Sequence, residues 1–91
     1  MNKSDLIAAI ASDTSLSRAD ASRAIDSMFK RVTSVLQRGD EVRILGFGKF
    51  SVVNRNAKVG RDPRTGATLH IPASRQPKFK AGKELKQSVN T

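Results

Sequence analysis

The chain has 91 residues, no cysteine and a hydrophobic content of 37%, which predicts one small domain without disulfides or a cysteine-based metal site. No apolar run approaches the length of a membrane span and no signal peptide precedes the first predicted helix, so we expect a soluble, cytoplasmic protein. The net charge of +9 is uneven, because residues 49–91 hold ten basic and two acidic residues, and such asymmetry is typical of proteins that bind a polyanion.

A first helix is predicted over about residues 3–12, where apolar side chains recur at helical spacing. Asn2 or Ser4 can accept hydrogen bonds from the free backbone N–H groups at its start. Asp5 lies in the first turn, where the helix dipole favours a negative charge. The apolar residues of its buried face are Leu6, Ile7 and Ile10.

The second helix is predicted over residues 18–38, and at about 30 Å it is the longest element of the chain. Ser17 can cap its start, with Asp20 in a capping-box arrangement, and Gly39 ends it. Its apolar stripe needs a partner surface, and Phe29 adjoins this stripe, so we expect Phe29 in the core. The stripe consists of Ala21, Ala24, Ile25, Met28, Val32, Val35 and Leu36.

Residues 41–44 alternate polar and apolar side chains and therefore predict a short, half-buried strand. We interpret residues 46–48 as a tight turn rather than a phosphate-binding loop. A phosphate-binding loop would need a further glycine or a Gly-Lys-Ser/Thr run, and neither follows. Phe50 and Val52 continue the apolar face beyond this turn. Phe79 returns to the same body and points inward, opposite its two lysine neighbours.

Residues 54–75 predict a long β-hairpin arm that projects from the sheet. Asp62 and Pro63 suit the first two positions of a type I turn, and Gly66 supplies the left-handed backbone that leads into the second strand. Pro72 excludes a central strand, which agrees with a projecting ribbon. The basic residues of the arm are Arg55, Lys58, Arg61, Arg64 and Arg75.

Small and apolar side chains occupy odd positions of the arm and predict one apolar face along it. Two interpretations stay open: this face holds the hairpin together through cross-strand pairs, or it presses on a ligand. His70 is the only histidine, and we interpret it as an exposed strand residue rather than a metal ligand or a catalytic base. The odd positions are Ala57, Val59, Ala67, Leu69, Ile71 and Ala73.

A short last helix is predicted over residues 82–91, with Gly82 as its N-cap and Leu85 on its apolar side. Lys80 and Lys83 lie beside its start, where free backbone N–H groups and the helix dipole favour a phosphate. This end of the chain therefore adds a second basic region to the arm.

The combined motifs are Gly46–Phe50, Arg55, Gly60–Gly66, Pro77–Phe79 and Gly82–Lys83. Together they resemble the HU/IHF family of bacterial histone-like DNA-bending proteins, and the similarity covers essentially the whole chain. The resemblance implies an α+β fold that forms an intertwined dimer, with two N-terminal helices, a three-stranded antiparallel sheet carrying a protruding hairpin arm, and a short C-terminal helix. Residues 1–91 would form one domain, with a helical dimerisation part at 1–39, the sheet at 40–80, the arm at 54–75 and the last helix at 82–91.

The resemblance also implies that two arms embrace DNA through the minor groove, as HU and IHF do. Pro63 would then wedge between base pairs, although on the residues alone a turn-setting role explains it equally well. Asp62 departs from the family, which usually places Asn or Lys before this proline, so we expect somewhat reduced affinity. The implied dimer core consists of Phe29, Phe47, Phe50 and Phe79. The implied DNA-binding residues are Lys3, Arg55, Lys58, Arg61, Pro63, Arg64, Arg75, Lys80, Lys83 and Lys86.

The leading hypothesis is a non-enzymatic, nucleoid-associated dimer, of identical or paralogous subunits, that bends and compacts double-stranded DNA with little sequence specificity. The alternatives are a sequence-specific IHF-like bending factor and a helix-turn-helix regulator, and the nearly neutral residues 1–48 disfavour the latter. An RNA-binding protein would need exposed stacking aromatics, and an enzyme would need a nucleophile beside a base. No cofactor, metal, membrane or small-molecule substrate is expected.

Overall fold

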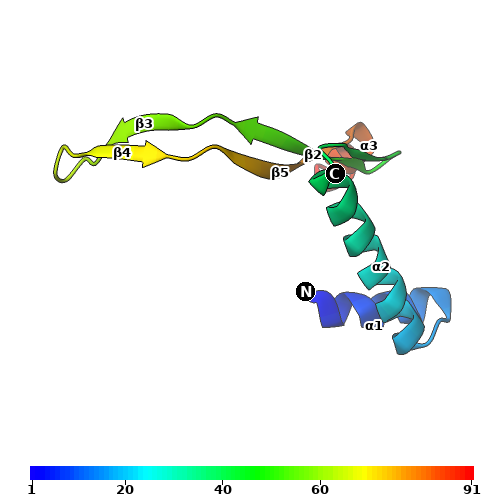
Figure 1. The fold of residues 1–91 in the computed structure, drawn as a ribbon. Helices are drawn as coiled ribbons and strands as arrows, with labels where there is room; N and C mark the ends of the chain where they lie inside the picture. The colour runs from blue at the N-terminus through cyan, green and yellow to red at the C-terminus, as the bar shows by residue number, and fades with distance from the viewer. The chain divides into compact units, whose positions relative to one another are not determined.

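The computed structural model describes all 91 residues as three helices and five strands (Figure 1). In chain order these are α1 (Lys3–Thr14), α2 (Arg18–Gln37), β1 (Val42–Ile44), β2 (Gly48–Arg55), β3 (Lys58–Arg61), β4 (Thr68–Ile71), β5 (Ser74–Ala81) and α3 (Lys83–Val89). The α+β class predicted from the sequence is confirmed. The chain separates into two compact units, residues 1–34 and 35–91, which are described in turn. None of the helices combines the length and the apolar character that crossing a membrane requires.

The first helix, α1, begins at a complete capping box. The Asn2 side chain accepts a hydrogen bond from the Asp5 backbone N–H at 2.9 Å, and the Asp5 carboxylate accepts one from the Asn2 N–H at 3.2 Å. This selects Asn2 over Ser4 as the cap. The helix continues two residues beyond the predicted end, to Thr14, because the left-handed conformation that stops it occurs only at Ser15, with φ of 61°.

The part of α2 in the first unit has the predicted Ser17 cap but lacks the reciprocal Asp20 bond of a capping box, and it buries little of its apolar stripe. Ser17 accepts a hydrogen bond from the Asp20 N–H at 3.0 Å, while the Asp20 carboxylate pairs with Arg23. The buried residues of the whole chain are Ala11, Ala21 and Ile25. The expectation that Phe29 lies in the core is wrong for a single chain, since this side chain is 43% exposed. One neighbouring helix cannot cover the full circumference of α2.

The second unit begins with the C-terminal end of α2, where Gly39 takes the left-handed conformation, with φ of +79°. The helix ends at Gln37, one residue before the predicted end. A residue far along the sequence donates hydrogen bonds to its last carbonyls. One guanidinium nitrogen of Arg75 donates to the oxygens of Leu36 and Gln37, both at 2.9 Å. A cation at this end is favoured by the helix dipole.

The three-stranded sheet has the order β1-β2-β5 and is antiparallel throughout. Phe50 lies directly opposite Val42 on β1 and Phe79 on β5, so these side chains share one face, as the alternation predicted. The Phe79 ring centroid lies 4.8 Å from that of Phe50 and 5.4 Å from that of Phe47. A Cβ added to Gly48 would lie 2.6 Å from this ring. Only glycine therefore fits at this position.

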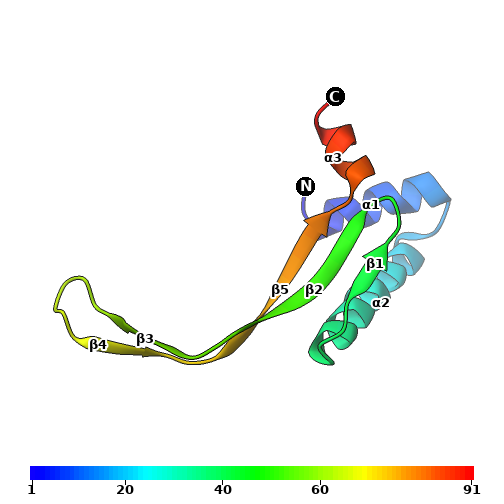
Figure 2. The ribbon, with the colours of Figure 1, turned by 90° about the horizontal axis from the view of Figure 1, so that it is seen from above.

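The arm continues the β2–β5 hairpin into the two-stranded β3–β4 ribbon, which lies at the end remote from α3 in both views (Figures 1 and 2). Gly66 has the predicted positive φ, at 72°. Two backbone bonds close the turn, from the Gly66 N–H to the Asp62 carbonyl at 2.7 Å and from the Asp62 N–H to the Ala67 carbonyl at 2.9 Å. The turn is therefore wider than the four residues of the predicted type I turn. The Asp62 side chain also accepts from the Arg64 N–H at 2.8 Å.

The prediction of a single apolar face along the arm is wrong. In the β3–β4 register, Val59 lies opposite His70, and Gly60 lies opposite Leu69. Residues directly opposite one another share a face of the ribbon, so each odd position of one strand shares its face with an even position of the other. Val59 and Leu69 consequently point to different faces of the ribbon.

Candidate nucleic-acid interface

The β1-β2-β5 sheet has one basic face, opposite the face that carries Phe50 and Phe79. Lys49 lies directly opposite Arg43 on β1 and Lys80 on β5, which places three cations in a row across the sheet. One pleat further along, Lys78 lies opposite Ser51. We call this surface the basic face. Its basic residues are Arg43, Lys49, Arg55, Lys78 and Lys80.

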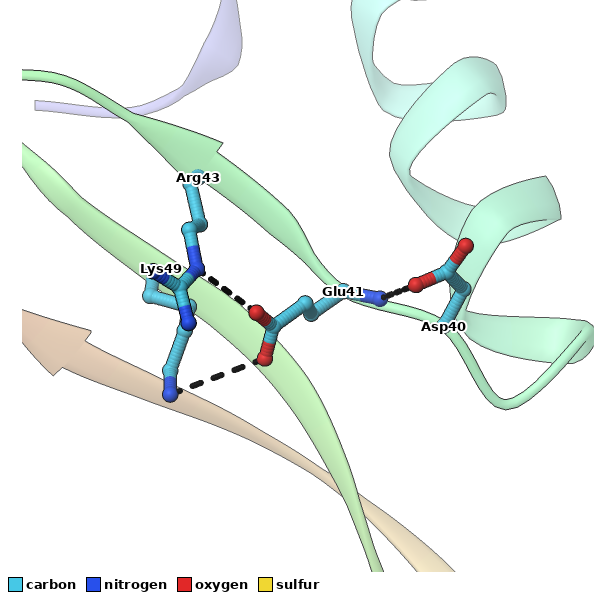
Figure 3. Close-up of polar contacts among 4 residues, drawn as sticks. All are labelled: Asp40, Glu41, Arg43 and Lys49. Atoms are coloured by element: carbon cyan, nitrogen blue, oxygen red, sulfur yellow. Dashed lines mark hydrogen bonds and ion pairs between the residues drawn. The ribbon is translucent and has the colours of Figure 1, made fainter.

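One acidic side chain lies on the basic face. The Glu41 carboxylate accepts from Nε of Arg43 at 2.6 Å through one oxygen, and its other oxygen lies 3.6 Å from Nζ of Lys49 (Figure 3). The hydrogen bond from Arg43 holds the pKa of the Glu41 carboxyl below its ordinary value, with a smaller contribution from Lys49. Glu41 is therefore negatively charged at neutral pH and forms a bridge between these two cations.

The arm presents its basic side chains to solvent. Lys58, Arg61 and Pro63 are exposed, and the side chain of Arg64 is 89% exposed. Nε of Arg64 lies 3.9 Å from the Asp62 carboxylate. An ion pair this exposed contributes little to stability, so it leaves Arg64 available to another anion. Asp62 acts here as an acceptor that organises the turn.

Two further residues from the predicted site have partners within the chain. Lys3 pairs with Asp26 at 2.6 Å between Nζ and the carboxylate, inside the first unit. Arg75 is held at the C-terminal end of α2 by its two hydrogen bonds. In the free protein both side chains are engaged, whereas those of Lys58 and Arg61 have no acidic partner within ion-pair distance.

A second basic region lies where β5 leads into α3. Gly82 is the N-cap of α3, as predicted, and its N–H donates to the Phe47 carbonyl at 2.8 Å. An open hollow of about 740 Å³ lies beside it. The basic residues that line the hollow are Arg43, Lys49, Lys80, Lys83 and Lys86. The structure thus connects the predicted Lys80, Lys83 and Lys86 with the basic face.

Arg43, Lys49 and Lys78 lie on the basic face but were not among the site residues predicted from the sequence. A signal for them was present, because each occupies a position that alternates with an apolar residue of the opposite face. His70 lies exposed in β4, opposite Val59. No group of three His, Cys, Asp or Glu side chains is arranged to hold a metal ion.

Comparison with known proteins gives a consistent result over the full length. Residues 1–90 match the sequence model of a family described as bacterial DNA-binding protein. The chain is 53% identical to DNA-binding protein HU-beta of Pseudomonas fluorescens over 90 residues, which cover 99% of this chain and 100% of that protein. It is 49% identical to DNA-binding protein HU-1 of Halalkalibacterium halodurans, with the same coverage of 99% and 100%. Its fold matches the Anabaena HU–DNA cocrystal structure with a TM-score of 0.88 and 35% identity, covering 98% of this chain and 97% of that one.

Proposed function

Because the chain belongs to the family of bacterial DNA-binding proteins, we propose that it is a nucleoid-associated protein that bends and compacts double-stranded DNA. The observation that carries this proposal is the exposed basic arm, which continues the hairpin that also bears the basic face. Most of the affinity comes from phosphate neutralisation, which is independent of sequence. Selectivity then comes from the cost of bending, and little sequence specificity results.

The acting form is a dimer. Within one chain only three small or medium-sized residues are buried, while Phe29, Phe47 and Phe79 are each 43% exposed. A soluble protein that leaves several aromatic rings uncovered has an incomplete core, and association with a second chain completes it. The second chain is either an identical subunit or a paralogue with the same apolar surface.

In the dimer two arms reach into the minor groove, with Lys58, Arg61 and Arg64 on the DNA backbone and Pro63 at a base step. The remaining proposed contacts are Lys3, Arg55, Arg75, Lys80, Lys83 and Lys86. Lys3 and Arg75 must first leave the partners they have in the free protein. Pro63 suits the role of a wedge, because its ring is compact and apolar and lies exposed in the turn at the tip of the arm.

The arm is expected to be mobile in the free protein and ordered on DNA. The β3–β4 ribbon buries none of its side chains, so its local stability is close to zero. Backbone amides from Lys58 to Ile71 should exchange hydrogen rapidly in the free protein and slowly in the complex. The paired amides around Phe50 and Phe79 are the internal control and should be protected in both states. Strong protection of the free arm would show that it packs against a core.

Replacing Pro63 with alanine separates bending from binding. Pro63→Ala is expected to reduce the bend angle of the DNA and the preference for nicked DNA. Unstacking a base step costs a few kcal/mol, and the small alanine side chain cannot replace the proline ring between the separated bases. Binding to a linear duplex should largely survive, since Arg61 and Arg64 remain. Energy transfer between dyes on the two DNA ends measures the bend, and a gel-shift titration of linear and nicked duplexes measures binding. If the variant bends DNA as sharply as the wild type, Pro63 only sets the turn and does not act as a wedge.

A further inference from the structure

The row of cations on the basic face is only partly available to a ligand. Arg43 and Lys49 share the Glu41 carboxylate, whereas Lys80, directly opposite Lys49, has no acidic partner. All three belong to one face of the same sheet. The chain therefore presents a potential phosphate-binding surface of which one part is already occupied by an internal anion (Figure 3).

We infer that Glu41 lowers the affinity of the basic face for DNA by occupying Arg43 and Lys49, and that a phosphate of bound DNA displaces its carboxylate from them. This inference rests on the proposed function. Carboxylate and phosphate oxygens accept charge-assisted hydrogen bonds from the same guanidinium and ammonium donors, so the two anions compete for one position. Glu41 is then an affinity-setting residue of the interface, and no other acidic side chain forms an ion pair with a cation of the basic face.

The displacement is sterically and energetically accessible. The Arg43 side chain is 75% exposed, and those of Lys49 and Glu41 are each 35% exposed, so a phosphate can approach the cluster from solvent. Exposed ion pairs are screened by water and salt, and opening them costs little. The contact between Glu41 and Lys49, at 3.6 Å, is longer than a good hydrogen bond and is the first to be lost.

Glu41 also reduces the number of counterions that DNA binding releases. The Glu41 carboxylate neutralises one of the two positive charges that it contacts. When a phosphate displaces it, the freed carboxylate attracts a cation from solution, which offsets one of the counterions that the DNA releases. Glu41→Gln keeps the size of the side chain but removes this charge. We expect the logarithmic slope of affinity against salt to steepen by about 0.9. At about 50 mM salt, binding should become about three to ten times tighter.

The experiment measures binding of a labelled linear duplex by fluorescence anisotropy at several salt concentrations. Asp13→Asn is the charge control, because Asp13 is exposed on α1 and has no ion-pair partner. The second control is Glu41→Gln in a background that already carries Arg43→Gln and Lys49→Gln. Thermal midpoints of all variants establish that each one is folded.

The inference predicts a larger gain in affinity and slope for Glu41→Gln than for Asp13→Asn, and loss of this excess in the background without Arg43 and Lys49. An effect no larger than that of Asp13→Asn overturns it, and so does an excess that persists in that background. In both cases wild-type binding remains, and the proposed function stands. A wild-type chain that binds no duplex even at about 50 mM salt overturns the proposed function and the inference together.

Discussion

Raising the salt concentration from about 50 to about 200 mM is expected to weaken DNA binding by about three to five powers of ten, for roughly 6–10 phosphate contacts per bound protein. The physical reason is that each cation on the DNA backbone releases a counterion, and dilute salt favours that release. The exposed cations of the arm, the basic face and the start of α3 supply enough charge for this number of contacts. Titrations at four or more salt concentrations give the slope.

Single substitutions on the arm assign this slope to residues. Arg61→Ala and Arg64→Ala should each flatten it by about one unit, with little change in sequence preference. Arg75→Ala is the informative contrast, because the Arg75 guanidinium stabilises the end of α2 in the free protein. Its removal should lower the thermal midpoint, which the two arm substitutions leave unchanged. A slope that is unaffected when both Arg61 and Arg64 are removed would place the arm away from the DNA backbone.

Features that depend on a few consecutive residues could be predicted from the sequence. Ser17 caps α2, Gly39 ends it, Gly66 reverses the arm and Gly82 caps α3, each in the expected position. At Ser17 a side-chain hydrogen bond determines the local backbone, and at Gly39 and Gly66 the lack of a side chain permits the positive φ. The last helical residues were less well predicted: α1 ends at Thr14 and α2 at Gln37, because the apolar pattern does not mark where the helical hydrogen bonds stop.

Features that depend on pairing between distant residues were missed. The two faces of the arm follow from the register of β3 with β4, which alternation along one strand does not determine. Arg75 donates to carbonyls 38 and 39 residues earlier in the chain, and nothing near it in the sequence indicates these partners. Its positive charge alone therefore predicted only a contact with a ligand. Arg43 and Lys49 join the site only because β1, β2 and β5 align them with Lys80.

Truncating Phe79 is expected to have the largest effect on stability. In one chain the ring is 43% exposed, although it contacts Phe47 and Phe50 and covers Gly48. If a second chain buries it, Phe79→Ala should reduce the free energy of unfolding by about 3–5 kcal/mol, the usual cost of removing a buried phenylalanine. If the ring stays half exposed, the cost is a fraction of that value, since less apolar area is lost from the folded state. The loss of unfolding free energy in Phe79→Ala therefore shows whether a second chain buries this ring.

Leu69→Ala is the matched control, because Leu69 is 44% exposed in one chain but lies on the arm, outside the proposed dimer core. Its truncation should change the free energy of unfolding by less than about 1 kcal/mol. Chemical denaturation at several protein concentrations measures both variants. For a dimer that dissociates as it unfolds, the midpoint rises with protein concentration, and sedimentation shows the Phe79→Ala variant shifting to monomer. Two results together would contradict the dimer: a wild-type chain that sediments as a folded monomer at micromolar concentration, and an equal loss of unfolding free energy for the two truncations. The exposed phenylalanines would then have no partner, and the dimer would no longer be part of the proposed function.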